Sequence, residues 1–339
     1  MILDKISGTK DILILTTKIR EASTIAISGH VKPDGDCVGA CLGLCTYLRE
    51  NYPDKTVDVI LDPVNARFHF LKYADEIIHQ EEAIAAGIPE MSYDIYFCLD
   101  CSETERLGFA EEYFFNADYR ICIDHHITNK GFGNLSFIQP DASSTCEIIY
   151  TLLDKDKISL DCANALYTGI VHDTGVFAHN NTTRKTMEIT GALIEKGIDT
   201  EKIIDDTFYR KTYIQNQILG RALMESILVM DGQVIFSIIT KKDMRLYGID
   251  STDLEGIVDQ LRVTQGVEVA LLLYEQEDQV YKVSMRSNGL VNVSKIAVYF
   301  GGGGHAMAAG CTMSGKARDV INSITALVED QIQQKEING

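Results

Sequence analysis

Histidine and aspartate residues occur together near the beginning of the sequence. His30, Asp34 and Asp36 lie within one short loop that Pro33 and Gly35 interrupt. Mixed imidazole and carboxylate ligands suit Mn²⁺, Fe²⁺ or Zn²⁺ better than Ca²⁺, which prefers oxygen ligands alone. The same residues also fit a solvated acidic turn in which Asp36 caps the helix that follows. A divalent metal site and a helix cap are therefore both open at this loop.

Further acidic and imidazole residues follow two apolar segments. Asp100 comes directly after one such segment, and Asp124, His125 and His126 come directly after another. Neighbouring side chains of an extended chain point to opposite sides, so one histidine can hold a metal while the other faces a ligand. Asp124 can orient an imidazole through a hydrogen bond, and Asp173 adds a later carboxylate. The alternatives are a capping role for Asp100 and ordinary surface histidines.

A glycine-rich motif marks the last third of the chain. Gly301–Gly304 precede His305, and four consecutive glycines let the backbone approach an anion and present N–H groups to it. Upstream, Arg286, Ser287 and Asn288 place a guanidinium and two polar groups at the end of a predicted strand. Arginine is suited to bidentate phosphate contact. The alternative for the glycines is a flexible surface loop.

The elements that must position these residues alternate between strands and helices. Strands are predicted at 24–29, 56–61, 94–99 and 119–123, and helices at 1–22, 36–51, 65–78, 143–153, 162–170 and 182–196, the last capped by Thr182 or Asn181. This alternation predicts an α/β fold with a mostly parallel sheet and helices on both faces. Ligands bind at the C-terminal ends of such strands, where His30, Asp100 and Asp124 stand. Metal-type ligands from three strands should therefore meet at one edge of the sheet.

The second half has a different pattern. Residues 199–225 read as a helical connection, and 226–339 as a smaller mixed α/β domain that begins with a hairpin around Asp231 and Gly232. Strands are predicted at 267–274 and 279–285, and helices at 253–263, 292–300 and 316–335. A length of 339 residues, 45% of them hydrophobic, supports two domains with separate cores.

Composition limits the partners. The formal net charge of −18 argues against long duplex nucleic acid, although local cations and metals can still hold a small phosphorylated ligand. No apolar run reaches the roughly 18 residues that span a bilayer, the N-terminus lacks signal-peptide features, and the nine cysteines show no disulfide-scaffold spacing. We therefore expect a cytoplasmic protein without a membrane partner. The oligomeric state is open, a homodimer included.

Together these motifs resemble those of the DHH phosphoesterases and their associated C-terminal domain. The resemblance rests on H-x-x-P-D-G-D-x-x-G at His30–Gly39, Asp100, the triplet Asp124–His126, Asp173, R-S-N at Arg286–Asn288 and G-G-G-H-x-x-A-A-G at Gly302–Gly310. It covers nearly the whole chain in family order, and the layout looks most like the bacterial nano-RNase and 3′-phosphoadenosine-5′-phosphate phosphatase branch. His172 stands where the family pattern has a less ionisable residue. We leave His172 and His179 out of the predicted site.

The resemblance implies a catalytic domain at 1–198, a linker at 199–225 and a substrate domain at 226–339, with the active site in the cleft between the two domains. It also implies two divalent cations, with Mn²⁺ expected, held by His30, Asp34, Asp36, Asp100, His125 and Asp173. Asp100 would bridge the ions, and His126 would face the scissile phosphate with Asp124 behind it. A terminal phosphate would be bound by Arg286, Ser287, Asn288, Gly303, Gly304 and His305.

The implied activity is hydrolysis of short RNA oligomers to 5′-mononucleotides and removal of the 3′-phosphate from adenosine 3′,5′-bisphosphate (pAp). An alternative within the same chemistry is a phosphodiesterase for pApA or cyclic di-AMP. An alternative of another class is a catalytically silent nucleotide-binding regulator, for which a missing ligand would be the signature. Every expected ligand is present in this sequence.

Overall fold

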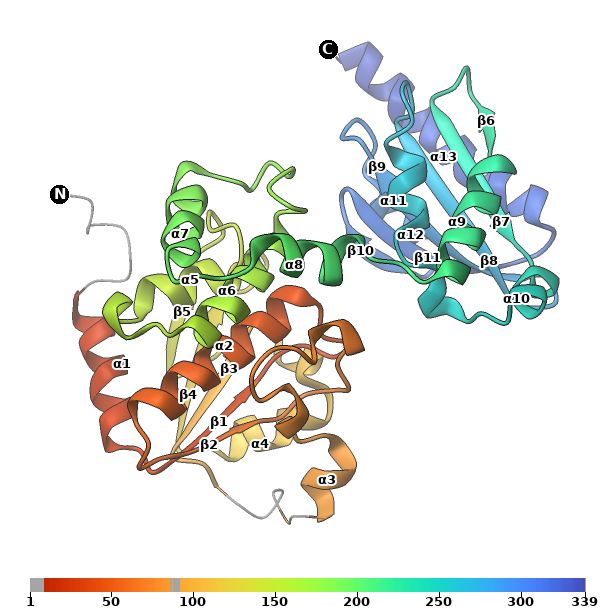
Figure 1. Ribbon diagram of the computed structural model, residues 1–339. Coiled ribbons are helices and arrows are strands. Elements are labelled where there is room, and N and C mark those ends of the chain that lie inside the picture. The colour runs from red at the N-terminus through yellow and green to blue at the C-terminus, as the bar shows by residue number, and fades with distance from the viewer. Residues whose placement is uncertain (1–8, 86, 88–91, 339) are drawn as a thin grey trace. The chain divides into compact units, whose positions relative to one another are not determined.

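The computed structural model describes residues 9–85, 87 and 92–338 and divides the chain into two units, Met1–Arg210 and Lys211–Gly339 (Figure 1). The predicted N-terminal helix is α1 (Thr9–Glu21), and its residues 1–8 lie outside the described residues. The predicted connection is divided between the units. Helix α8 (Thr200–Ile204) and the π-helical turn Asp205–Tyr209 fall in the first unit, and α9 (Tyr213–Met224) falls in the second.

The first unit contains a five-stranded parallel sheet. Its strands lie in the order β2 (Thr56–Val59), β1 (Thr24–Ser28), β3 (Ile95–Leu99), β4 (Tyr119–Asp124) and β5 (Leu135–Ile138). The predicted parallel sheet is therefore confirmed. The sequence prediction missed β5, because it is a four-residue edge strand whose burial alternates and whose apolar signal is correspondingly weak.

Helices cover both faces of this sheet, because successive strand residues point to opposite sides. On one face Ile25, Ile27 and Phe97 belong to a core that includes residues of α1, α2 (Gly35–Asn51), α5 (Thr145–Leu152) and α6 (Leu160–Asp173). On the other face Tyr96 and Cys98 pack against α3 (Gln80–Ala85) and α4 (Glu111–Asn116). The strands are thus buried from both sides, as a parallel sheet requires.

Two local predictions are wrong. The predicted helix at 65–78 is two 3₁₀ turns, Ala66–Phe68 and Ala74–Glu76, because Tyr73 between them has a φ of +66° that no right-handed helix contains. The cap of α7 (Arg184–Ile194) is Thr183 rather than Thr182 or Asn181, and its side chain accepts the N–H of Thr186 in a capping box.

The second unit contains a six-stranded mixed sheet. Its strands lie in the order β10 (Gly303–His305), β11 (Ala308–Ser314), β9 (Val280–Ser287), β8 (Val269–Glu277), β7 (Val234–Ile239) and β6 (Ile227–Val229). Only β7 and β8 of this series run parallel, and the predicted hairpin is confirmed as the antiparallel pair β6–β7. The turn joining that pair has positive φ at both Asp231 and Gly232.

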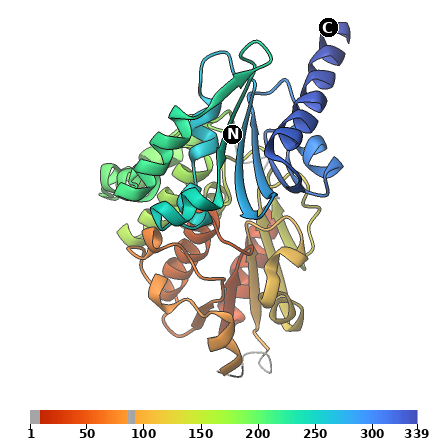
Figure 2. The ribbon, with the colours of Figure 1, turned by 90° about the vertical axis from the view of Figure 1, so that its right-hand side faces the viewer.

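Helices also cover both faces of the second sheet. One core joins the sheet to α12 (Val293–Tyr299) and the long α13 (Ala317–Asn338), and the other joins it to α9 and α11 (Ile257–Arg262). Figure 2 shows α13 along one side of these strands. The sequence prediction missed the short α10 (Lys241–Tyr247).

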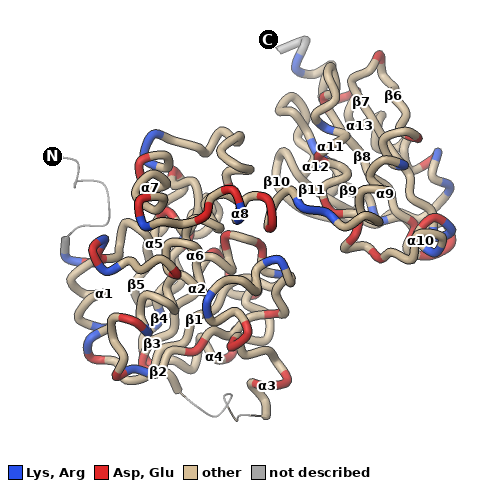
Figure 3. The backbone as a smooth tube through the Cα atoms, viewed as in Figure 1, with Lys and Arg blue, Asp and Glu red and all other residues tan. Residues whose placement is uncertain are grey.

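Acidic positions are distributed along the backbone of both units (Figure 3), as the net charge of −18 leads one to expect. Within the described part of the chain, no helix has both the length and the apolar character needed to cross a membrane.

Candidate metal centre

The parallel sheet brings the predicted ligands to one edge. Strands β1, β3 and β4 are neighbours, and His30, Asp100 and Asp124 stand at or just beyond their C-terminal ends. His30 Nε2 lies 3.5 Å from Asp100 Oδ2. The inference that separate strands deliver these side chains to one place is therefore confirmed.

Asp100 is at the centre of the cluster and is almost completely buried. Its Oδ2 faces His30, whereas its Oδ1 lies 3.6 Å from His125 Nε2 and accepts a 3.0 Å hydrogen bond from Thr145 Oγ1. The backbone turns sharply here, with a φ of +53°. Each oxygen of one carboxylate thus faces a different imidazole, which is the arrangement expected of a bridging ligand.

His30 presents one defined nitrogen to this cluster. Its Nδ1 lies 2.9 Å from the carbonyl oxygen of Val31, and because a carbonyl can only accept, Nδ1 carries the hydrogen. Nε2 faces Asp34 at 3.6 Å as well as Asp100, and it offers a lone pair whenever the ring is neutral. Burial alone lowers the pKa of His30, but Cys37, Asp100 and Asp34 outweigh it and raise the pKa to about 12. The groups around His30 therefore strongly favour a positive charge at this position.

Asp34, and not Asp36, caps helix α2. Asp34 Oδ1 accepts the backbone N–H groups of Asp36 and Cys37, each at 3.1 Å. Its other oxygen faces His30. The capping alternative that the sequence left open for Asp36 is therefore wrong, and Asp34 combines a cap with one outward-facing oxygen.

Asp36 is held by a different helix. It is almost completely buried, and its two oxygens accept the backbone N–H groups of Thr145 at 2.6 Å and Cys146 at 3.0 Å in the first turn of α5. Helix N-termini favour such negative charge. Burial nevertheless raises the pKa of Asp36 well above its ordinary value, and the carboxylates of Asp100 and Asp173 raise it further. Several carboxyl groups are thus gathered close to Asp36 in a buried place.

The Asp124-His125-His126 triplet divides into two environments. His125 Nε2 lies 3.5 Å from Asp173 Oδ2 and 3.6 Å from Asp100 Oδ1, inside the acidic cluster. His126 Nδ1 lies 2.7 Å from Asp124 Oδ1. That hydrogen bond is the main reason why the pKa of His126 is raised to about 9. Asp124 thus orients and charges His126.

The sequence prediction missed Asn129, which holds the Asp124 carboxylate through a hydrogen bond. Asn129 Nδ2 donates to Asp124 Oδ2 at 2.8 Å and to the carbonyl of Cys101 at 2.9 Å, and its Oδ1 accepts the N–H of Gly131. Both oxygens of the buried Asp124 therefore have partners. The only sequence signal is a polar residue closely following the histidine pair, which is too weak to identify such a role.

Asp173 is the last residue of α6. Asn181 Nδ2 donates to the backbone oxygen of Asp173 at 3.1 Å and to the carbonyl of Ser143 at 2.9 Å. Burial raises the pKa of Asp173 to about 8, with further contributions from Asp100 and Asp34. Without a cation, this carboxyl group therefore favours its protonated form near neutral pH.

His172, which was omitted from the predicted site, packs against Gly35 in the loop that carries His30, Asp34 and Asp36. A Cβ on Gly35 would collide with the His172 ring, so glycine at this position permits the contact. The ring lies edge-on between Phe68 and Phe208, with centroid distances of 5.1 and 5.6 Å. His172 therefore supports the loop by packing.

The His172 imidazole is neutral and donates a hydrogen bond to Thr207. Its Nε2 lies 2.9 Å from Thr207 Oγ1, and because that hydroxyl donates to the carbonyl of Ile203, Nε2 must be the donor. Burial, and then the charge of Arg67, lowers the pKa of His172 to about 4. His179 lies nearby, with Nδ1 3.3 Å from the backbone oxygen of Asp173.

The ligand geometry fits a divalent cation. Three groups of potential ligand atoms lie within 4.8 Å of one another, namely His30–Cys37–Asp100, Asp100–His125–His126 and Asp36–His125–Asp173. The first and second share Asp100, and the second and third share His125. Imidazole and carboxylate together suit Mn²⁺ and similar ions. The sequence prediction did not include Cys37, whose buried thiol has a pKa raised well above its ordinary value.

In the second unit, the sheet register aligns two predicted phosphate-binding residues. Arg286 on β9 is opposite Ala308 on β11, which in turn is opposite His305 on β10. Opposite residues of antiparallel strands point to the same face. Arg286 and His305 therefore share a face, two strands or roughly 10 Å apart, with only a methyl group between them.

The glycines of β10 permit this register. Gly304 has a φ of +138°, and a Cβ there would lie 2.5 Å from the Cα of Ala309. Gly303 pairs with Gly310, so both predicted glycines belong to the short edge strand that ends at His305. Glycine thus allows the edge backbone to lie close to β11.

The side chains of Ser287 and Asn288 form hydrogen bonds within the protein. Ser287 is fully buried, and its Oγ donates at 2.8 Å to Glu268 Oε1, which also accepts the N–H groups of Leu290 and Val291. The Ser287 hydroxyl therefore holds the loop after β9 and does not face solvent.

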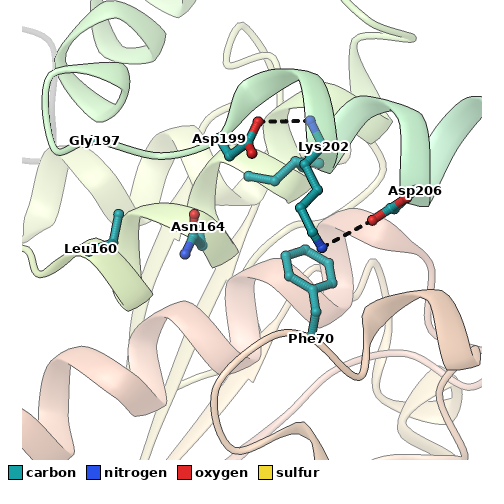
Figure 4. A pocket seen from close by; sticks show the side chains of 8 residues that line it. Phe70, Leu160, Asn164, Gly197, Asp199, Lys202 and Asp206 are labelled. Carbon is teal, nitrogen blue, oxygen red and sulfur yellow. Dashed lines mark hydrogen bonds and ion pairs between the residues drawn. The ribbon is translucent and has the colours of Figure 1, made fainter.

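A separate pocket of about 200 Å³ lies elsewhere in the first unit (Figure 4). Phe70 and Leu160 contribute its apolar wall, and Lys202 Nζ donates to Asp206 Oδ2 at 3.3 Å at its edge. None of the predicted metal ligands lines this pocket.

Comparison with known proteins agrees with this geometry. Residues 24–170 match the DHH family, N-terminal domain, and residues 231–334 match the DHHA1 domain. The bifunctional oligoribonuclease and PAP phosphatase NrnA of Thermus thermophilus is 31% identical, covering 86% of this chain and 84% of its own. The Bacillus subtilis protein of that name is 26% identical, and the match covers 86% of this chain and 89% of the relative. The crystal structure of an exopolyphosphatase-related protein from Bacteroides fragilis has a TM-score of 0.90 at 25% identity, covering 98% of both chains.

The fold and the matched domains define the class of this protein, which is an α/β phosphoesterase. The chain belongs to the DHH family, and it carries the DHHA1 domain in its second unit.

Proposed function

We propose that this enzyme hydrolyses short RNA oligomers to 5′-mononucleotides and removes the 3′-phosphate of pAp. The observation that carries the proposal is the Asp100 carboxylate, one oxygen of which faces His30 and the other His125. Relatives named for both activities match over most of the chain, which supports this choice of substrates.

The proposed cofactors are two divalent cations, with Mn²⁺ as the expected ion. His30 and Asp34 would hold one, and Asp36, His125 and Asp173 would hold the other, with Asp100 between them. When bound, such a pair lowers the pKa of a water molecule and neutralises charge on the phosphate. The raised pKa values of Asp36 and Asp173 support this assignment, because carboxyl groups gathered without a cation retain protons.

His126 and Asp124 would act on the phosphate itself. Asp124 holds Nδ1–H of His126 and raises its pKa, so the imidazole is protonated at neutral pH and its Nε2–H can donate to a phosphate oxygen. Arg286, the backbone of Gly303 and Gly304, and His305 would bind a terminal phosphate, and anchoring one end of the substrate favours short molecules. A cytoplasmic location and a homodimer remain predictions.

The test uses the full chain loaded with Mn²⁺ and three substrates, pApA, pAp and cyclic di-AMP, with products separated by chromatography. We expect AMP from pApA and from pAp. Absence of turnover with both of these, in protein shown to contain metal, would refute the proposal. Preferential cleavage of cyclic di-AMP would instead favour the cyclic-dinucleotide alternative, and tight nucleotide binding without turnover would favour the silent regulator.

A further inference from the structure

Two side-chain pairs connect α11 with the end of β9. Arg286 Nε lies 2.8 Å from Asp259 Oδ1, and its Nη2 lies 3.4 Å from Asp259 Oδ2. Arg262 Nη1 donates to Asn288 Oδ1 at 2.8 Å. Asp259 and Arg262 are three residues apart on the helix and therefore lie on one side of it. Both guanidinium groups are thus held between α11 and the end of β9.

Asn288 has no donor left for an anion. Its Nδ2 donates to the backbone oxygens of Arg262 at 3.1 Å and Val267 at 2.7 Å, which occupies both amide hydrogens. A fully ionised phosphate can accept hydrogen bonds but cannot donate them. It would therefore find no free donor on the Asn288 side chain. Asn288 instead holds the Arg262 guanidinium in place through Oδ1.

The two arginines differ in whether a carboxylate offsets their positive charge. Asp259 offsets the charge of Arg286, whereas Arg262 forms no ion pair with any carboxylate among the residues that the structure describes. One N–H of Arg262 Nη1 is used by Asn288, and the other N–H groups of this guanidinium can donate to a ligand. In a chain with a net charge of −18, such an uncompensated guanidinium is a local attraction for anions.

The surrounding loop is rigid enough to keep this arrangement. Glu268 Oε1 accepts hydrogen bonds from Ser287 Oγ and from the N–H groups of Leu290 and Val291, on both sides of Asn288. Asn288 also donates its backbone N–H to the carbonyl of Glu268 at 2.9 Å. The position of the Asn288 side chain, and so that of Arg262, is therefore determined by several bonds.

We infer that Arg262 is a further phosphate-binding residue of the second unit, with Asn288 as its positioning residue. This inference rests on the proposed function, because the phosphate is the terminal phosphate of the proposed substrate. Arg262 contributes the net positive charge, and Arg286, held by Asp259, contributes a directed donor at the end of β9, the strand that Asn288 directly follows. Arginine can offer two parallel N–H groups to a phosphate, which makes it well suited to this role.

The test compares pApA, which has a terminal phosphate, with ApA, which lacks it, using the full Mn²⁺-loaded chain. We expect Arg262→Gln to raise the KM for pApA by about 10-fold or more with little change in kcat, since a hydrogen bond to a charged group contributes that much. The KM for ApA should hardly change. Arg245→Gln, which alters an exposed arginine on α10, is the control and should change neither KM.

Equal losses for the two substrates would overturn the inference, because a merely structural role affects both alike. An unchanged KM for pApA would overturn it as well. If the wild-type protein turns over neither substrate, the proposed function fails, and calorimetric affinities for AMP and adenosine then decide the inference. In that case Arg262→Gln should weaken AMP binding alone.

Asn288→Ala tests the positioning role. We expect a smaller rise in the KM for pApA than Arg262→Gln causes, and no further rise when the two substitutions are combined, because residues acting as one unit are not additive. Additive effects would contradict the positioning role of Asn288.

Discussion

Asp124 accepts a 2.7 Å hydrogen bond from His126 Nδ1 while Asn129 donates to its other oxygen. This pairing separates the two histidines of the triplet, since His125 instead faces the carboxylates of Asp100 and Asp173. Adjacent residues thereby acquire different chemistry from their different neighbours.

Asp124→Asn should lower kcat by about 100-fold or more and leave the metal content unchanged. The amide keeps the shape of the carboxylate but removes the charge that holds His126 protonated, and positioned acid groups typically contribute that much to rate. Steady-state kinetics and elemental analysis of the purified variant provide the measurement. Near-normal turnover would contradict the role given to Asp124, and loss of metal would make it a ligand instead.

The affinity for Mn²⁺ should rise as the pH increases from 6 to about 8. The pKa of Asp173 is raised to about 8 in the metal-free protein, so a bound proton must leave before the carboxylate can hold a cation. Below that pKa the proton competes, and affinity falls with falling pH. Calorimetric titration at several pH values measures this, and Asp173→Asn should have weaker and less pH-dependent affinity. A wild-type affinity that is independent of pH would argue against the assignment.

His172→Ala should destabilise the protein by about 2 to 4 kcal/mol, because it removes a buried ring that packs against Gly35, Phe68 and Phe208. Urea unfolding of the metal-free protein gives the value. His172→Phe retains the ring and loses only the hydrogen bond to Thr207, so it should lose about 1 kcal/mol. If both variants unfold like the wild type, His172 does not support the loop by packing.

Ser287→Ala should lower stability by about 1 kcal/mol without changing the KM for pAp. Its hydroxyl is buried and donates to Glu268, so the variant loses an internal hydrogen bond and no ligand contact. Thermal unfolding and steady-state kinetics separate the two effects. A raised KM at unchanged stability would restore Ser287 as a direct substrate contact.

Much of the fold could be predicted because its signals are local. Apolar segments ending at His30, Asp100 and Asp124 are strands in the structure, and a parallel sheet places strand ends of one direction at one edge. The failure at 65–78 is also local in origin. Its composition permits a helix, but Tyr73 adopts a left-handed conformation that spacing alone does not reveal.

Which residue types reach the strand ends could be predicted from short segments, because strand and helix periods are local properties. The partners of those residues depend on how distant segments pack. Asp36 depends on the N-terminus of α5, more than a hundred residues later in the chain, and Asn288 gives its donors to backbone carbonyls and its oxygen to Arg262. Such partners are chosen by the packing of distant segments, and no local pattern encodes which donor meets which acceptor.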